Sequence, residues 1–324
     1  MKQKAHLFTD KIIDCHTHSA GVDFFGMVKG HYPLSQDVDI LSNRLKNNNI
    51  DYAITFPFPN TIYYDINSFI DIFQYKPSGL SHFPFEQENI NLLNQVKHFQ
   101  TSNLLPFLSF SLNDKVDEQI RNIETLVTDN YVYGLKYHTF TDHHSAKDIM
   151  QHPQILDCMR EHDLPLLIHS GQQEMTSATH IYELAKAVPD VRFCAAHLGR
   201  FNKKFWQQIM TNPLPNLFVD MSPFINLHSR FALNKYKAEE TLDCDTVDTL
   251  KALVYICKLL PDNLLWGTDS PYTHTQYLNE RPQHITSYED EVSLLKNLND
   301  QTIKKVASKN TLRFIFGNRC NERH

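Results

Sequence analysis

A barrel of eight parallel strands enclosed by helices is the fold that this sequence predicts. Eight short apolar runs occur along the chain, and segments whose apolar residues recur at helical spacing alternate with them. Parallel strands need a crossover of a dozen or more residues, which a helix usually supplies. The length of 324 residues is typical of such a barrel folded as one domain. We therefore expect an α/β protein in which residues 1–324 form a single (β/α)8 TIM barrel.

The first half of the chain contributes four of the predicted strands. We expect strands at residues 12–18, 50–58, 104–112 and 133–138, with helices at 35–48, 86–99 and 117–127. Ser35 is a candidate N-cap for the first of these helices. Residues 59–85 form an insertion after the second strand that is rich in tyrosine and phenylalanine. Long insertions are often functional, so we expect this one to form part of a substrate lid or a subunit contact.

The second half of the chain completes the alternation. We expect strands at residues 164–170, 191–198, 216–221 and 264–269, with helices at 146–162, 178–188, 202–210, 246–260 and 289–316. A second insertion follows the seventh strand at residues 222–243. An open, doubly wound sheet is the alternative fold, but no Gly-x-Gly-x-x-Gly turn follows any strand, so the sequence gives no support for dinucleotide binding.

Composition narrows the possible partners. The formal net charge is -6 and no basic stripe is present, which argues against binding to a nucleic-acid backbone. The basic N-terminus has no apolar segment behind it, and no run approaches the roughly 18 apolar residues of a membrane span. The six cysteines include no Cys-x-x-Cys pair, so we expect reduced thiols. A cytoplasmic protein without nucleic-acid or membrane partners is the prediction.

Chemically active side chains gather where the predicted strands end. His16 and His18 alternate with Thr17, so in a strand they point the same way and lie about 6 to 7 Å apart, within reach of one ion. Such a pair is expected by chance in a chain with 18 histidines, and it gains weight only from further ligands. Other strand ends supply such groups: Lys136, His138, His169, His197 and Asp269. In a barrel these ends form the active-site face, so the sequence predicts a metal site there. Four further histidines fall in predicted loops or helices and are expected at the surface: His143, His144, His152 and His162.

Four short motifs together resemble the amidohydrolase superfamily. The motifs are His16-Thr17-His18, Leu167-Ile168-His169, Ala196-His197-Leu198-Gly199 and Trp266-Gly267-Thr268-Asp269-Ser270-Pro271. They are most similar to the amidohydrolase-related branch, which includes aminocarboxymuconate semialdehyde decarboxylase and various hydrolases. The segment 304–317 also resembles the closing helix of that branch. Related deoxyribonuclease-like barrels carry a glutamate on a middle strand and a His-Cys-Phe motif on the sixth strand. Neither feature occurs here, which disfavours nuclease function.

The resemblance implies a set of residue roles. It places one divalent ion per chain, usually zinc, on the residues matching His16, His18, His169 and Asp269, with His197 facing the bound water or the substrate. Asp269 would then ligate and shuttle a proton, and His197 would stabilise an oxyanion or act as the acid-base group. Three residues are assigned to substrate binding: Lys136, His138 and Arg200.

Several alternatives stay open at this point. The leading expectation is a metal-dependent hydrolase that acts on a small-molecule amide, ester or lactone through metal-activated water. A metal-dependent decarboxylase of an unsaturated or aromatic acid is the alternative, and a non-catalytic binding barrel is a third. Some amidohydrolases carry a carboxylated lysine that bridges two metals at the place of Lys136. We expect instead one ion and a cationic Lys136. A homo-oligomer is possible, and the sequence does not determine the oligomeric state.

Overall fold

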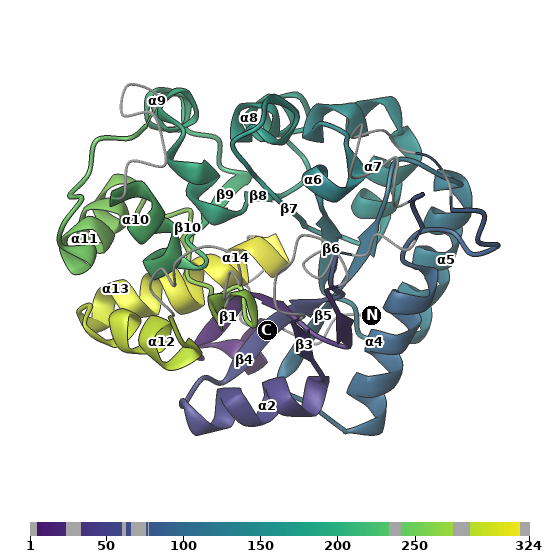
Figure 1. The fold of residues 1–324 in the computed structure, drawn as a ribbon, viewed down its shortest axis with the longest axis horizontal. Helices are drawn as coiled ribbons and strands as arrows, with labels where there is room; N and C mark the ends of the chain where they lie inside the picture. The colour runs from purple at the N-terminus through teal and green to yellow at the C-terminus, as the bar shows by residue number, and fades with distance from the viewer. Residues whose placement is uncertain are drawn as a thin grey trace.

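Eight parallel strands form the centre of the molecule (Figure 1). The structure, a computed structural model, describes residues 5–23, 34–59, 63–65, 76, 78–232, 241–274 and 286–317. In the order of the sheet the strands are β1 (Ile13–His18), β4 (Tyr52–Phe56), β5 (Leu104–Phe110), β6 (Gly134–Tyr137), β7 (Leu166–Ile168), β8 (Phe193–Ala195), β9 (Leu217–Asp220) and β10 (Leu264–Leu265). Each lies within one of the eight predicted runs.

Backbone hydrogen bonds join the last strand region to the first and close the ring. The amide of Cys15 donates to the carbonyl of Trp266 at 3.0 Å, and the amide of His18 donates to that of Ser270 at 2.8 Å. The amide of Asp269 in turn donates to the carbonyl of His16 at 2.8 Å. The predicted (β/α)8 barrel is therefore confirmed, and its closure places Asp269 directly beside the first strand.

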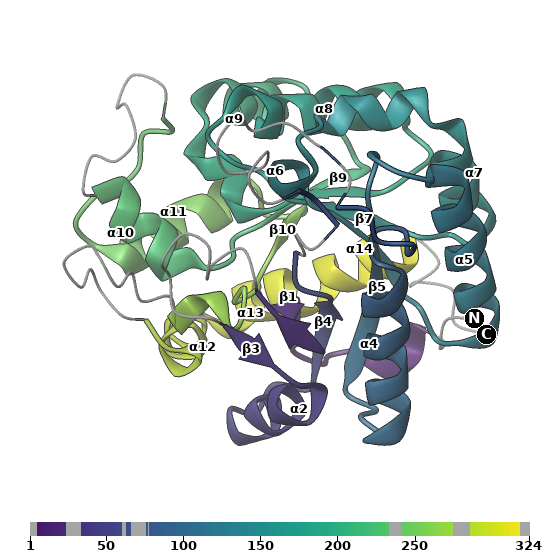
Figure 2. The same ribbon diagram turned by 45° about the vertical axis from the view of Figure 1, so that its right-hand side comes forward.

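Helices surround the ring of strands (Figures 1 and 2). They are α2 (Val38–Asn47), α4 (Glu86–His98), α5 (Val116–Asp129), α6 (Thr139–Asp142), α7 (Pro153–Glu161), α8 (Ala178–Ala187), α9 (Lys203–Thr211), α10 (Phe224–Ala232), α11 (Thr249–Leu259), α12 (Tyr288–Lys296), α13 (Asp300–Lys304) and α14 (Asn310–Phe316). Shorter elements are η1 (Ala5–Phe8), β2 (Gly21–Val22), β3 (Ser35–Gln36), η2 (Ala146–Gln151), η3 (Glu174–Thr176), η4 (His197–Phe201), η6 (Tyr272–His274) and the π-helical turn η7 (Lys305–Lys309). Within the described residues, no helix has both the length and the apolar character required to cross a bilayer.

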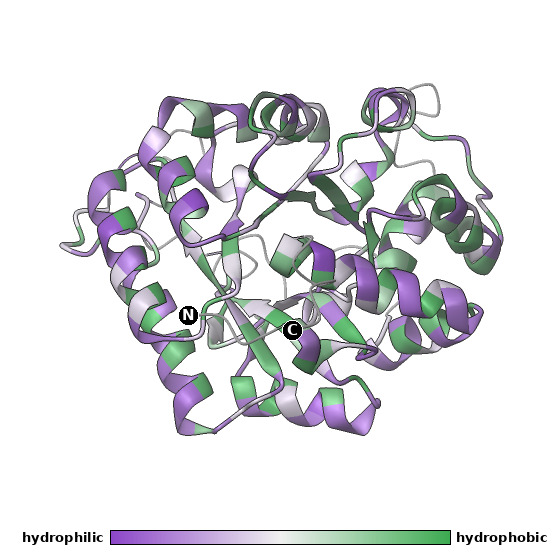
Figure 3. Cartoon of the chain, turned by 180° about the vertical axis from the view of Figure 1, so that it is seen from behind, coloured by the Kyte–Doolittle hydropathy of each residue, from purple (hydrophilic) through white to green (hydrophobic). Residues whose placement is uncertain are grey.

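The hydrophobic core has two parts. A larger cluster fills the space between the strands and the surrounding helices, and a smaller one fills the barrel interior. The interior cluster also includes η1 and α14, where Phe8 and Phe316 stack at 5.6 Å between ring centroids. In Figure 3 the central strands are mostly hydrophobic and the outer helix surfaces mostly hydrophilic. Since η1 and α14 pack against one end of the interior, the polar chemistry is left to the opposite end.

Three local expectations were wrong. Ser35 is not the N-cap of α2, because it pairs with Val22 in an antiparallel ribbon and Asp37 takes the N-cap position. The helix expected over residues 146–162 divides at Pro153, which lacks the N–H needed to continue the preceding turn. The sixth strand ends at Ala195, short of the expected residue 198, because a left-handed turn follows it.

The first insertion is described only in part. Residues 60–62, 66–75 and 77 lie outside the described residues, so its expected role as a lid or subunit contact remains a prediction. The described portion packs on the barrel: the hydroxyl of Tyr63 donates to Glu88 at 2.8 Å, and that of Tyr64 donates to Asp142 at 3.3 Å. Both tyrosines are buried. In the second insertion, residues 224–232 form α10, and residues 233–240 lie outside the described part.

Candidate functional site

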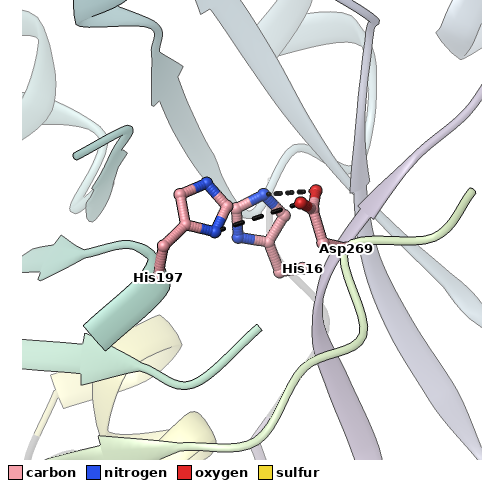
Figure 4. Close-up of side chains that lie close together, drawn as sticks. All are labelled: His16, His197 and Asp269. Carbon is pink, nitrogen blue, oxygen red and sulfur yellow. Dashed lines mark ion pairs between the residues drawn. The ribbon is translucent and has the colours of Figure 1, made fainter. Parts of the chain in front are cut away.

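His16, His197 and Asp269 come together at the strand ends. One potential ligand atom of each lies within 4.8 Å of the others (Figure 4). Oδ1 of Asp269 lies 3.3 Å from Nε2 of His16 and 3.4 Å from Nε2 of His18. Its Oδ2 lies 4.0 Å from Nδ1 of His197. The two carboxylate oxygens therefore face different histidines, one toward the pair on β1 and the other toward the turn after β8.

Hydrogen bonds at the Nδ1 atoms fix the orientation of these rings. Nδ1 of His16 donates to Asp220 at 2.9 Å, that of His18 to the carbonyl of Pro57 at 3.2 Å, and that of His197 to the carbonyl of Ser222 at 2.6 Å. In a neutral imidazole the lone pair then resides on Nε2, the atom that binds metals.

The surroundings of His16 and His197 favour this neutral form. Burial lowers the pKa of both rings well below the ordinary value. Nε2 of His16 is buried and has no hydrogen-bond partner. A buried nitrogen of this kind normally has a partner, and an ion would supply one. The imidazole and carboxylate donors beside it match the preferences of a divalent metal.

Asp220, the last residue of β9, is a member of the site that the sequence reasoning did not select. Its Oδ2 accepts from His16, and its Oδ1 accepts from the amide of His197 at 3.1 Å and from the amide and hydroxyl of Ser222 at 2.9 and 2.7 Å. The side chain is fully buried. The rule that selected the other residues, a polar group at the end of an apolar strand run, would also have selected this one.

Replacing Asp220 by asparagine is expected to weaken metal binding about 10- to 100-fold, the usual effect of losing a carboxylate that orients a histidine ligand. Asparagine keeps the volume but offers one acceptor oxygen in place of two, so one of the four donors loses its partner. The metal content after equilibration with a buffered chelator measures the effect. Glu291→Gln is a matched control, because Glu291 is also a buried carboxylate and accepts the amide of Ile225 at 2.9 Å. Equal metal affinity in the Asp220 variant and the control would contradict the orienting role.

His169 and His138 form a second group beside the first. The ring of His169 lies 5.0 Å from that of His197 and stacks on His138 at 4.2 Å, with 18° between the planes. Within the described residues, no ion pair joins the ring of His169 to Asp269. Nδ1 of His138 accepts the amide of Thr141 at 3.2 Å, so a neutral His138 carries its proton on Nε2. In this tautomer Nε2 of His138 is a hydrogen-bond donor and has no lone pair to offer a second ion.

Lys136 and Arg200 supply positive charge. Nζ of Lys136 is buried without a hydrogen-bond partner and lies 4.6 Å from the centroid of the Phe56 ring. Burial lowers the pKa of Lys136 to about 8, and the nearby carboxylates of Asp220 and Asp269 partly oppose that shift. Nε of Arg200 donates to the carbonyl of Ser170, the residue after His169, at 3.2 Å.

The turn that carries His197 has unusual backbone geometry. All five residues from His197 to Phe201 have φ between 53° and 60°, and only Gly199 lacks the Cβ that makes such values unfavourable. Left-handed helical conformation costs roughly 1 to 2 kcal/mol per L-residue. Asp269 has φ of 57° as well. Strain of this kind concentrates at functional sites, where the surrounding structure holds it in place.

Comparisons with known proteins agree with this geometry. A family model described as amidohydrolase matches residues 101–316. No curated protein sequence matches the chain significantly.

Solved structures of the same fold include three that represent different chemistries. A dihydroxybenzoic acid decarboxylase from Polaromonas sp. JS666, with bound manganese and 2-nitroresorcinol, has a TM-score of 0.60 at 13% identity and covers 94% of this chain and 96% of its own. A probable 2-pyrone-4,6-dicarboxylic acid hydrolase from Acinetobacter baumannii, with citric acid bound, has a TM-score of 0.58 at 12% identity. The match covers 95% of this chain and 99% of the hydrolase. A dihydroorotase from Campylobacter jejuni has a TM-score of 0.52 at 16% identity. The match covers 94% of this chain and 82% of the dihydroorotase. At these identities the likeness establishes a shared fold.

Proposed function

Because the chain belongs to the amidohydrolase family, whose members are metal-dependent hydrolases and decarboxylases, we propose that it hydrolyses an amide, ester or lactone bond in an anionic small molecule. The observation that carries this proposal is the position of Asp269, with one oxygen toward His16 and His18 and the other toward His197. Such a carboxylate can hold an ion with one oxygen and accept a proton with the other.

The residues suited to hold the ion are His16, His18 and Asp269, with His169 as the expected fourth. We propose zinc, because imidazole and carboxylate donors suit it, although manganese occupies the decarboxylase that shares the fold. When bound, the ion would act as a Lewis acid toward a carbonyl group and lower the pKa of water to about 7.

The protein's own groups would handle the protons. Asp269 would take a proton from the attacking water and return it to the leaving group. His197 is neutral because of its burial, and its Nδ1–H is held by the carbonyl of Ser222, so Nε2 is available as an acceptor. Of the two roles expected for His197, acid-base chemistry is therefore favoured over donation of a hydrogen bond to an oxyanion.

Three side chains would recognise the substrate. A cationic Lys136 would pair with a carboxylate or carbonyl oxygen, which would relieve its buried ammonium group of the cost of having no partner. His138 would donate through Nε2, and Arg200 would contribute a second positive charge. Carboxylic acids also appear in the names of two of the similar proteins: a probable 2-pyrone-4,6-dicarboxylic acid hydrolase and a dihydroxybenzoic acid decarboxylase.

Decarboxylation is the second candidate, and the buried Lys136 favours it too, since a cation near the site can hold the substrate's carboxylate. A panel of lactones, amides, esters and carboxylated aromatics, tested with zinc- and manganese-loaded protein, would distinguish the two reactions. Hydrolysis gives an acid without loss of carbon, whereas decarboxylation releases carbon dioxide from a labelled carboxylate. Failure of the metal-loaded protein to turn over any member of the panel would count against both.

Replacing Lys136 by methionine is expected to raise KM for an anionic substrate about 10- to 100-fold, the equivalent of one charged hydrogen bond of roughly 1.5 to 3 kcal/mol. The variant should keep its single ion. Steady-state kinetics with the acid, and with its neutral methyl ester as control, would measure the effect. A carboxylated, bridging Lys136 would instead bring a second ion into the strand-end site, and that ion would be lost in the variant and partly restored by a short-chain carboxylic acid.

A further inference from the structure

A second cluster of potential metal ligands lies on the outside of the barrel, between α5 and α7. Glu124 on α5, Cys158 on α7 and His162 at the C-cap of α7 each place one ligand atom within 4.8 Å of the others. We propose that these three side chains bind one thiophilic divalent ion of the zinc class. His162 shortly precedes β7, so the cluster lies toward the end of the barrel where strands begin, opposite the strand-end histidines.

The helical spacing explains why two of the ligands converge. Cys158 and His162 are four residues apart and so share one face of α7. The helical geometry extends to His162, because its amide donates to the carbonyl of Cys158 at 3.1 Å. Glu124 approaches from the neighbouring helix. Zinc bonds of about 2.0 to 2.3 Å would need only a modest contraction of this group, which side-chain rotation can provide.

No other interaction in the described structure occupies these side chains. Neither the carboxylate of Glu124 nor the ring of His162 has a side-chain hydrogen bond or an ion pair within the described residues, and Cys158 is a free thiol. The nearest arginine in sequence, Arg160, binds Asp157 and Asp190 instead. The Glu124 carboxylate is therefore a negative charge with no bonded cation in the described structure, beside two further ligand atoms, and such a charge attracts a metal ion.

Access and chemistry are both compatible with binding from solvent. The thiol of Cys158 is buried, while Glu124 and His162 are half-buried and form the solvent side of the cluster. Coordination would displace the thiol proton to solvent and leave a thiolate on the metal. Water would complete the tetrahedral set of four. The ion would join α5 to α7, so its expected role is to stabilise this side of the barrel.

Cobalt titration of the full-length protein, stripped of metal with a chelator beforehand, tests the proposal. Since the strand-end site has no sulfur among its proposed ligands, a sulfur-to-cobalt charge-transfer band in the near ultraviolet would report the second site alone. We expect the band to appear and saturate in the unchanged protein and to be absent in Cys158→Ser, which should bind one cobalt fewer per chain. His162→Gln and Glu124→Gln should each weaken cobalt binding about tenfold or more, since even a residue that only orients a metal ligand changes metal affinity about 10- to 100-fold.

Cys257→Ser is the matched control. Cys257 is a buried cysteine on α11, but proline occupies the position four residues later, so it has no helical histidine partner. This variant should titrate like the unchanged protein. No charge-transfer band in the unchanged protein, or a band that persists in Cys158→Ser, would overturn the proposal. If Cys158→Ser does not fold, His162→Gln and Glu124→Gln decide the question, because both keep the thiol. Unchanged cobalt affinity in both variants would also overturn the proposal.

Discussion

Replacing His16 by alanine is expected to remove most of the divalent ion from the strand-end site and to lower kcat/KM by about 10³-fold or more, beyond the 10- to 100-fold typical of a residue that only orients a metal ligand. The reason is geometric: Nε2 of His16 lies 3.3 Å from Oδ1 of Asp269, is buried, and makes no hydrogen bond within the described structure. Alanine removes this nitrogen and leaves the Asp220 carboxylate without its imidazole donor. Metal analysis after dialysis against a chelator, together with steady-state kinetics, measures both effects.

A histidine outside the site provides the control for that experiment. His180 is also buried, and both of its ring nitrogens make polar contacts. Nδ1 lies 2.9 Å from the hydroxyl of Ser145, and Nε2 lies 3.2 Å from the carboxylate of Glu174. His180→Ala should lose stability but keep the ion. His169→Ala should lose the ion, as His16→Ala does. A full complement of metal in both His16→Ala and His169→Ala would show that the proposed ligand set is incorrect.

His197→Asn is expected to keep most of the metal while kcat falls by about 10² to 10⁴, the range for a lost acid-base group. Asparagine can still donate a hydrogen bond to the carbonyl of Ser222, but it has no basic nitrogen in place of Nε2. The decisive comparison is metal content alongside kcat, measured on the same preparation. His197 also lies in the close group with His16 and Asp269. Metal loss equal to that of His169→Ala would therefore make His197 a ligand.

The sequence predicted the fold well because the strand signals are local. Each apolar run contains a strand, and the strand ends bring the side chains of His16, His197 and Asp269 close together, as expected for a barrel. The contacts within the site were harder to predict. The tautomer of His138 depends on the amide of Thr141, and the orientation of His16 depends on Asp220, which is 204 residues away in the chain. No local pattern specifies such pairings.

The local errors have a similar origin. Ser35 has the chemistry of an N-cap, but its pairing with Val22 determined its conformation. The left-handed turn from His197 to Phe201 contradicts the preference of four of its five residues, and tertiary contacts support it: Nε1 of Trp206 donates to the carbonyl of Leu198 at 2.9 Å. Sequence propensity describes the backbone conformation that a segment prefers in isolation. These segments instead adopt the conformation that their tertiary contacts in the barrel stabilise.

Residues 266–270 pair with β1 and close the barrel, and this seam has a consequence for how the chain folds. Thr268 donates to Asp14, 254 residues earlier in the chain, through both its amide and its hydroxyl at 3.0 and 2.7 Å. Contacts of such long separation form late, because the loop between them must first be organised. During synthesis, the hydrogen bonds between β1 and residues 266–270 can therefore form only after nearly the whole chain has left the ribosome. An ion held by His16, His18 and Asp269 would bridge this seam, so binding the metal and finishing the barrel would be one event.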